Sequence, residues 1–398
     1  MANNNENKIL NVPHLRFPEF SGEWKKCKLG DLCNVLMCKR ILVSQTNTED
    51  GVPFYKIGTI GSTPDAYISK ELFDDYKVKY NYPRKGEVMI TCAGTVGKCV
   101  VYDGEDAYFQ DSNIVWIDNP TQYISNGFLF HLLSKVDWRK LNSTTIIRIY
   151  NDDLRNLKMS YPRKEEQQKI SHLLSLLDER IATQNKIIYK LKSLIRGIMV
   201  ELQKRGLSNG TWKKVLLSNV LTERNELNKS LYPVYSVSVI QGIVNQMEYL
   251  GRSFAASDTS KYHVVHYGDL VYTKSPTGSF PYGIIKQSYN QNEVAVSPLY
   301  GVYEPKTFST GVFLHEYFKS ELNTLNYLHP LVQKGAKNTI NIANQRFLES
   351  YVAIPSNANE LLAISKLLCS LNTKLEFLQN ILKQSQGQKQ YLLRQMFI

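Results

Sequence analysis

The sequence lacks the features of a secreted, membrane-spanning or zinc-binding protein. Its six cysteines include no Cys-x-x-Cys pair, so we expect free, mostly buried thiols and no metal site. No apolar run approaches the ~18 residues of a membrane span. The opening residues MANNNENKIL carry neither the basic nor the apolar part of a signal peptide. We therefore expect a cytoplasmic location.

Catalytic signatures are also missing. GTVGK (94–98) resembles a phosphate loop, but its glycines are too close for the Walker pattern, and Cys99 stands where Ser or Thr is required. There is no Gly-x-Gly-x-x-Gly motif at the start of a βαβ unit and no Asn-Pro-Pro-aromatic motif of amino-methyltransferases. The seven histidines form no HExxH or HxxxH set. We expect a chain that is not itself an enzyme and that binds no cofactor or metal.

One constellation leaves a catalytic alternative open. Asp65, Asp75 and Lys77 fit the loose Pro-Asp…Asp-x-Lys spacing of nucleases, in which two carboxylates hold Mg²⁺ and a lysine helps to activate water. The pattern is short, and the second half of the chain does not contain it. A single-chain nuclease is therefore the second hypothesis, and a Mg²⁺-dependent cutting assay on the chain alone would test it.

What the sequence does contain is an internal repeat. GEWKKCKLGDL (22–32) returns as GTWKKVLLSNV (210–220), and ISHLLSLLDERI (170–181) returns as ISKLLCSLNTKL (364–375). Between them, GEVMITCAGTVGKCVVY (86–102) matches the segment that begins at Gly268. The order is the same in both copies, which indicates a tandem duplication of a globular part followed by a helix. We place the parts at 1–161, 162–211, 212–355 and 356–398.

Both predicted helices carry an apolar residue alternately every three and four positions, which is the pattern of a coiled coil. Pro162 suits the start of the first helix, and Glu165 and Glu166 suit the positive end of its dipole. In the second helix, Ser385 and Lys389 interrupt the apolar stripe. We expect the two stripes to pack against each other, and not only on their own domains. The stripes contain Ile170, Leu174, Leu177, Ile181, Ile188 and Leu191 in the first helix and Ile364, Leu368, Leu371, Leu375, Leu378 and Leu382 in the second.

Forty helical residues make a rod of about 60 Å at ~1.5 Å per residue. If the helices pair antiparallel, the two halves are related by a pseudo-twofold axis and the rod fixes their separation. The globular halves contain short β-branched and aromatic runs between turn residues, such as VMIT (88–91), NIVWI (113–117), LVYT (270–273), YGII (282–285) and AVSPLYGVY (295–303). Segments 125–140 and 311–329 are expected to be helical. The fold class is α+β, with a twisted sheet in each half.

The net charge of +12 and the pI near 9.2 favour a polyanionic partner. The positive excess is concentrated in the helical parts, so DNA contacts in the first globular part must come from local patches. KVKYNYPRK (77–85) mixes cations with tyrosines, and TCAGTVGK (91–98) and TKSPTGS (273–279) are matched turns expected to expose hydroxyl and amine groups. An ordinary surface loop or turn explains each stretch about as well. The candidate DNA contacts are Lys77, Lys79, Arg84, Lys85, Thr91, Thr95, Lys98, Thr144, Arg148, Lys274, Ser275, Thr277, Lys334, Lys337 and Asn338.

Taken together, these motifs resemble the specificity subunit of a Type I restriction-modification enzyme. LRFPEFSGEWKKCKLGDL (15–32), YPRKEEQQKISHLLSLLDERI (161–181) and the terminal LLRQMF (392–397) carry the resemblance, which covers essentially the whole chain. It implies that 1–161 and 212–355 are target-recognition domains that each read one half of a split DNA sequence. The helices at 162–211 and 356–398 would then form an antiparallel coiled coil that sets the gap.

The resemblance also implies partners. Two methylation subunits would dock and bring S-adenosylmethionine, and restriction subunits would bring ATP and Mg²⁺, so that adenine methylation or cleavage occurs where this chain directs it. Leu361 stands where the first helix has Gln167, which puts equal docking of two methylation subunits in doubt. A rod of about 60 Å limits the target to about 18 base pairs at ~3.4 Å each. The third hypothesis is a protein-binding coiled-coil scaffold, which predicts no sequence preference for DNA.

Overall fold

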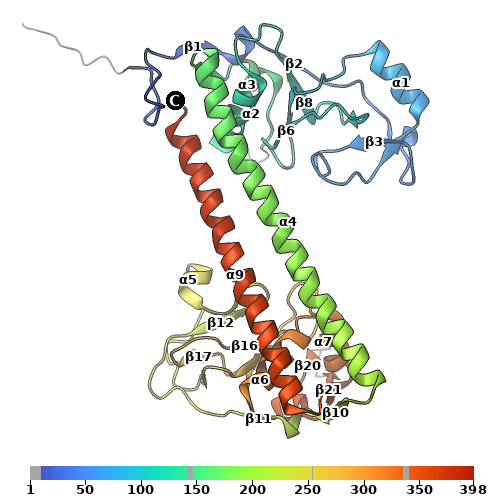
Figure 1. Cartoon of the computed structure of the whole chain (residues 1–398), viewed down its shortest axis with the longest axis vertical. Helices are drawn as coiled ribbons and strands as arrows, with labels where there is room; N and C mark the ends of the chain where they lie inside the picture. Colours follow the sequence, from blue (N-terminus) through green and yellow to red (C-terminus); the bar gives the residue numbers. More distant parts are fainter. Residues whose placement is uncertain (1–9, 141–146, 253, 335–339) are drawn as a thin grey trace, which may run out of the picture. The chain divides into compact units, whose positions relative to one another are not determined.

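The computed structural model describes residues 10–140, 147–252, 254–334 and 340–398 (Figure 1). The chain divides into two compact units, one formed by Met1–Gln184 with Ile381–Ile398 and the other by Asn185–Asn380. The first unit therefore contains the start of one long helix and the end of the other, and the second unit contains the complementary parts. The four boundaries expected from the sequence stay predictions.

An antiparallel four-stranded sheet forms the centre of the first unit. Its order is β2-β8-β5-β6, and Val88 pairs with both Ile117 and Val101. All four residues of β5 are buried, as the apolar run 88–91 predicts for a central strand. The strands are β2 (Asn34–Leu36), β5 (Val88–Thr91), β6 (Cys99–Val101) and β8 (Ile114–Asp118).

The second unit repeats this sheet. Its order is β11-β18-β15-β16, again antiparallel throughout, and Leu270 pairs with both Tyr303 and Gln287. The strands are β11 (Leu221–Glu223), β15 (Leu270–Tyr272), β16 (Ile285–Gln287) and β18 (Gly301–Pro305). β5 and β15 come from matched sequence segments, and their two sheets have the same strand order. The sequence repeat is therefore also a repeat of the fold.

A two-stranded sheet closes each globular half next to its long helix. In the first half the sheet pairs β1 (Lys25–Lys28) with β9 (Lys158–Tyr161), and in the second half it pairs β10 (Trp212–Leu216) with β21 (Tyr351–Pro355). The repeated Trp-Lys-Lys opening therefore starts the strand that pairs with the last strand of its own half. Each pairing joins the first and last strands of a globular half, immediately before the chain enters a long helix.

The remaining elements are only partly alike in the two halves. The first half adds β3 (Val52–Tyr55), β4 (Tyr67–Ile68), α1 (Lys70–Lys79), β7 (Tyr108–Phe109), α2 (Asn126–Lys135) and α3 (Asn151–Arg155). The second half adds β12 (Tyr235–Ser238), β13 (Gly242–Asn245), α5 (Gln246–Leu250), β14 (His263–Val265), β17 (Val294–Val296), α6 (Phe308–Tyr317), α7 (Glu321–Leu328), β19 (Gln333–Lys334), β20 (Ile340–Asn341) and α8 (Asn344–Phe347). In the first half, β4, β3 and β7 form a second small sheet, in which β3 and β7 are parallel.

Two sequence expectations on these elements were wrong in detail. The helix expected over 311–329 is two helices, α6 and α7, because the chain turns at Phe318–Ser320, where Ser320 caps α7. The expected strand YGII contributes only its last residue, since β16 begins at Ile285. The basic stretch at 77–85 begins inside α1, whose N-cap Ser69 accepts a hydrogen bond from the Leu72 amide.

The long helix α4 (Lys164–Ser208) has a buried glutamate in its first turn, within the first unit. Glu166 is fully buried and accepts a 3.2 Å hydrogen bond from the Trp24 indole and two 2.7 Å bonds from the Arg16 guanidinium. This bidentate pair raises the pKa of Arg16. The carboxylate also lies in the first turn, where the helix dipole favours negative charge. One side chain thus fixes the helix start to the opening strand of its half.

The long helix α9 (Ala358–Gln395) repeats the junction in the second unit. The Trp212 indole donates to Glu360 Oε1 over 2.8 Å, and the two residues correspond to Trp24 and Glu166 in the sequence repeat. Gly206 lies directly against the Trp212 ring and leaves no room for a methyl group. The tryptophan that marks each repeat in the sequence therefore has the same structural task in both copies.

Gln167 connects α4 to α2 and has no free hydrogen-bonding group for a partner. Its side chain is fully buried, its amide donates to the Tyr123 and Pro162 carbonyls over 2.9 and 2.8 Å, and its oxygen accepts from the Ser125 amide over 2.7 Å. Ser125 is the N-cap of α2. Leu361, at the matching place in α9, is buried in the apolar core of the second unit. The loss of glutamine in the second copy therefore changes an internal contact.

In the first unit, the start of α4 and the end of α9 share one core. Ile170 and Leu174 pack with Leu393, Met396 and Phe397, and these residues join the apolar side of the four-stranded sheet. The two polar interruptions of the α9 stripe also lie inward. Ser385 is buried, and the Lys389 ammonium forms an ion pair with Asp178. His131 lies 4.0 Å from Asp178, and burial lowers its pKa to about 4, so it is neutral near pH 7.

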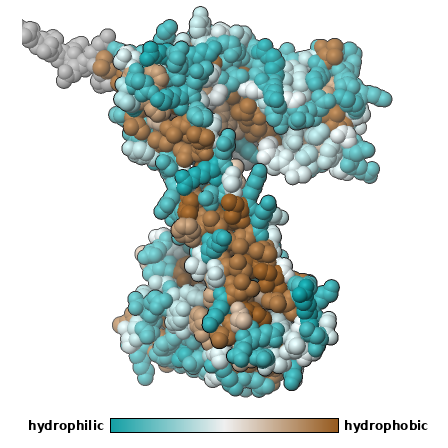
Figure 2. All heavy atoms as spheres, viewed as in Figure 1, coloured by the Kyte–Doolittle hydropathy of each residue, from teal (hydrophilic) through white to brown (hydrophobic). Residues whose placement is uncertain are grey.

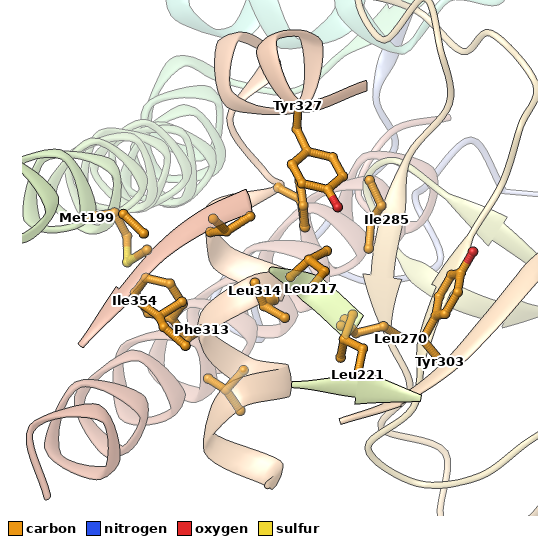
Figure 3. Packing of buried hydrophobic residues seen from close by; sticks show 14 of the residues in the cluster. Met199, Leu217, Leu221, Leu270, Ile285, Tyr303, Phe313, Leu314, Tyr327 and Ile354 are labelled. Carbon is orange, nitrogen blue, oxygen red and sulfur yellow. The ribbon is translucent and has the colours of Figure 1, made fainter. Parts of the chain in front are cut away.

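In the second unit, the end of α4 packs with the start of α9. Leu191, Ile195 and Met199 belong to the same buried cluster as Ile364 and Leu368. Figure 3 shows Met199 next to Ile354 and Phe313 in this cluster. The stripe is less enclosed further along α9, since Leu371, Leu375 and Leu378 are half-buried, as are Ile181 and Leu382 in the first unit. Each unit therefore pairs opposite ends of the two helices, which is the antiparallel arrangement expected from the sequence.

Two glycines of α4 give opposite predictions. Gly206→Ala should destabilise the second unit by about 1–3 kcal/mol, because the new methyl group overlaps the Trp212 indole. Gly197→Ala should stabilise the protein by about 0.5–1 kcal/mol, because nothing lies within 4 Å of the added methyl group and alanine favours helix. Urea unfolding monitored by circular dichroism measures both changes. Equal effects of the two substitutions would contradict the packing of Trp212 on α4.

Candidate nucleic-acid interface

The basic stretch expected to contact DNA begins in the last turn of α1. There Lys77 forms a 2.9 Å ion pair with Asp106 and lies over the rings of Phe73 and Tyr82, while Lys79 forms a 2.5 Å pair with Asp75. Both ammonium groups remain exposed. Their position at the helix C-terminus is electrostatically favourable without any ligand. Neighbouring carboxylates therefore offset part of the positive charge that the sequence offers here.

The tyrosines of this stretch have unequal roles. Tyr82 is half-buried, and its hydroxyl donates to the Ala107 carbonyl over 2.6 Å. Burial, reinforced by the hydrogen bond to the Tyr102 hydroxyl, raises the pKa of Tyr82 far above its usual range. Tyr80 is exposed and lies 5.3 Å from the Lys39 ammonium, measured to the ring centre. Of the two rings, Tyr80 is the one available for stacking.

Arg84 and Lys85 also differ, because only Arg84 has acidic partners within the residues that the structure describes. Arg84 Nε donates to Glu87 over 2.9 Å, and the guanidinium also pairs with Asp118. These contacts tie it to the residue before β5 and to the end of β8, and they raise its pKa, chiefly through Glu87. Lys85 is exposed and has no acidic group within ion-pair distance among the described residues. Lys85 is the member of the predicted 77–85 patch whose charge has no such partner in the described parts of the chain.

The turn between β5 and β6 corrects one expectation. Thr91 was expected to be exposed, but it is fully buried: its hydroxyl donates to the Thr95 carbonyl and accepts from the Lys98 amide over 3.1 Å. Thr95 and Lys98 are exposed, as expected. Their side chains donate to the carbonyls of Ile57, over 3.2 Å, and Ile60, over 2.5 Å. All three polar groups hold the turn and its neighbouring loop in place.

The matched turn of the second half is more open. Ser275 is exposed, Thr277 is half-buried, and the Thr277 hydroxyl donates to the Ser275 carbonyl over 3.1 Å. Lys274 is half-buried next to them, and desolvation lowers its pKa. This turn therefore combines a partly desolvated cation with an exposed serine.

The other candidates lie at the last connection of each half. Arg148 is half-buried and donates to the Ser112 carbonyl over 3.1 Å. Lys334 ends β19, whose backbone pairs with β20. Thr144, Lys337 and Asn338 lie outside the described residues. DNA contact by the candidate residues stays a prediction.

The nuclease constellation does not assemble. Asp65 forms a 2.9 Å ion pair with Lys56, Asp75 pairs with Lys79, and Lys77 pairs with Asp106. Across the described parts of the chain, no three His, Cys, Asp or Glu side chains come together as a metal ion requires. The six cysteines are free thiols, three of them buried, and burial raises the pKa of Cys33 and Cys38 to about 12. Within those same described parts, no helix has the length and apolar character of a membrane span.

Sequence reasoning missed one feature of the first half. A cavity of about 290 Å³ lies between the segment 40–46 and the ends of β3 and β7, and its lining includes Arg40, Lys56 and Gln110. These residues are far apart in the sequence and form no motif. Leu42 and Val43 are exposed in a short loop beside it, but the sequence alone does not show that exposure.

Comparison with known proteins finds similarity over part of the chain. The family model for the Type I restriction modification DNA specificity domain matches residues 21–193. A Haemophilus influenzae protein named as a type I restriction enzyme specificity subunit is 47% identical over 172 residues, 43% of this chain and 42% of that protein. The MjaX specificity subunit of Methanocaldococcus jannaschii is 24% identical over 202 residues, 47% of each chain. The matches thus span less than half of the curated relatives.

The fold has a solved counterpart along its whole length. The crystal structure of a Type I restriction-modification system S subunit from M. genitalium covers 97% of this chain and 99% of its own, with a TM-score of 0.62 and 15% identity. At that identity the likeness concerns the fold. Residues 21–193 are thus similar to the Type I restriction modification DNA specificity domain, and the chain as a whole has the fold of the M. genitalium S subunit.

Thr91 provides a test of the β5–β6 turn. Thr91→Val should destabilise the first unit by about 1–3 kcal/mol, because the Lys98 amide loses its buried acceptor. Thr91→Ser should keep both bonds and lose much less stability. Urea unfolding of the two variants measures the difference. If Thr91→Val were as stable as the wild type and only lost DNA affinity, the residue would be a ligand contact and not a turn support.

Proposed function

We propose that the chain reads a bipartite DNA sequence, with one half-site for each globular half, and directs partner subunits to it. The observation that carries this proposal is the duplicated sheet: β2-β8-β5-β6 and β11-β18-β15-β16 share their order and direction. Two copies of one scaffold can present matching loops to two similar ligands. The loops themselves differ: the hairpin β3–β4 is followed by the ten-residue helix α1, whereas the hairpin β12–β13 is followed by the five-residue helix α5. The two half-sites should therefore have different sequences.

The gap between half-sites is proposed to be set by the paired helices. In both units the pairing is apolar and continuous with the globular core, through Leu174 in one and Leu368 in the other. Helices fixed in this way resist bending at the points where they join the globular halves. A rod of about 60 Å would then keep the half-sites within about 18 base pairs.

Partner subunits are proposed to supply the chemistry. Methylation subunits would bring S-adenosylmethionine for adenine methylation, and restriction subunits would bring ATP and Mg²⁺ for cleavage, while this chain binds none of these groups. Exposed apolar side chains on the helices support docking of a protein partner: in the second unit they include Ile187, Leu194, Leu367 and Phe377. Figure 2 shows hydrophobic atoms at the surface along the helix segments of this unit.

Selection from randomised duplex DNA tests this function. The complex of the chain with its methylation subunit should enrich two short sequence blocks around a fixed gap, and its affinity should fall steeply as salt increases. Binding without any sequence preference would favour the scaffold hypothesis. Mg²⁺-dependent cutting by the chain alone would favour the nuclease.

The unpaired charge of Lys85 leads to a quantitative prediction. Lys85→Ala should weaken binding to all sequences about equally and lower the slope of log affinity against log salt by about 1, as expected for one lost phosphate contact. Lys158→Ala removes an exposed charge from β9 and is the matched control, expected to leave the slope unchanged. A change of preferred sequence in Lys85→Ala would mean that Lys85 reads bases.

A further inference from the structure

Within the part of the chain that the structure describes, several polar side chains that line the cavity of the first half lack the ion-pair or hydrogen-bond partners that most residues of the predicted basic patch have. Arg40 is exposed at its rim and has no carboxylate within ion-pair distance among the described residues. Gln110 accepts one long 3.4 Å bond from the Ile57 amide, and its side-chain NH₂ donates to no group in the described chain. The Asp111 carboxylate likewise has no donor among the described residues. The Arg40 guanidinium, the Gln110 NH₂ group and the Asp111 carboxylate therefore line one opening without such partners in the described chain.

The walls of this cavity are held in place. The Gln45 side chain accepts from the Leu42 amide over 2.8 Å, and the Thr46 hydroxyl donates to the Val43 carbonyl over 2.8 Å, which fixes the loop that carries Arg40. On the other side, Ser112 follows Asp111 with a left-handed φ of 53°. Arg148 donates to the Ser112 carbonyl over 3.1 Å and stabilises this conformation. Such preorganisation is what a recognition site needs, because less entropy is lost on binding.

Two apolar side chains project beside the polar groups. Val43 is 89% exposed and Leu42 is 56% exposed, although both belong to an ordered turn. Ordinary loops of this length use polar residues at such positions. An exposed apolar pair next to an unpaired guanidinium matches the mixed surface of the DNA major groove, which presents thymine methyl groups beside hydrogen-bonding base edges.

We propose that this cavity reads base edges of the first half-site in the major groove, with Arg40 donating to a guanine and Gln110 and Asp111 contacting the adjacent bases. The inference rests on the proposed function and assigns its site in the first half. Arginine pairs bidentately with guanine O6 and N7, glutamine with adenine, and aspartate accepts from the cytosine amino group.

The charges on the surrounding surface support the assignment of base reading to Arg40. Lys77, Lys79 and Arg84 each share their charge with a carboxylate, so they can touch phosphates but contribute little net attraction. The Arg40 guanidinium has no such partner within the described chain. A wrong base opposite it would leave its donors unpaired in a partly desolvated site, which is the physical basis of discrimination.

The experiment compares Arg40→Ala, Arg40→Lys and the control Lys158→Ala in complex with the methylation subunit. Selection from randomised duplex DNA and competition against single-base variants measure base preference. Both Arg40 variants should lose about 5- to 150-fold discrimination at one position of one half-site, because lysine keeps the charge but not the bidentate fork. The other half-site and the gap should not change. Gln110→Leu should relax an adjacent position in the same block.

The outcomes separate this inference from the proposed function. If the wild-type complex enriches no bipartite sequence, the proposed function fails and the site assignment fails with it. If the wild type enriches two blocks and both Arg40 variants enrich the same bases with the same discrimination, only the site assignment is overturned. A uniform loss of affinity in Arg40→Ala that Arg40→Lys restores would make Arg40 a phosphate contact and also overturn it. Thermal melting of each complex identifies variants that have not folded.

Discussion

The hydrogen bond from a tryptophan indole to a glutamate in the first turn of a long helix is the contact on which both halves depend. Trp24 and Glu166 form it in one unit, and Trp212 and Glu360 form it in the other. In each case the tryptophan opens the strand that pairs with the last strand of its half. Glu166 is fully buried and Glu360 is half-buried, and both lie in the first turn, where the helix dipole favours their charge. The junction therefore fixes the direction in which each helix leaves its sheet, and only then can the apolar stripes meet in register.

The polar residues of the helix seam show how the packing stays specific. Lys389 interrupts the apolar stripe of α9, yet its ammonium pairs with Asp178 of α4 within the first unit. Because one helix position provides the cation and one provides the carboxylate, a shift of register would leave a charge without its partner in a poorly solvated place. Ser385 is buried on the same stripe and keeps the helices close. The interruptions thus select one alignment, while residues such as Leu174 and Leu368 supply the apolar burial.

The sequence was sufficient to predict the repeat, the two long helices, their antiparallel pairing and the α+β class, because these depend on periodic patterns and on pairs of matched segments. It did not predict α1, since the spacing of Phe73 and its neighbours gives a short helix only a weak apolar stripe. Thr91 was wrongly predicted to be exposed. A threonine in a turn can either face the solvent or form a hydrogen bond within the turn, and the sequence does not show that the Thr95 carbonyl lies within reach of the Thr91 hydroxyl. The Arg40 cavity was missed because its walls come from four separate segments.

Methylome sequencing of cells that express this chain with and without its methylation subunit tests the central claim most directly. The account of two duplicated reading domains on one paired-helix rod predicts a methylated-adenine motif made of two different short blocks around a fixed gap, and only when both proteins are present. A single continuous motif, or two blocks with a variable gap, would contradict the role of the rod. No new motif from a well-folded complex would contradict the reading of DNA by the two halves.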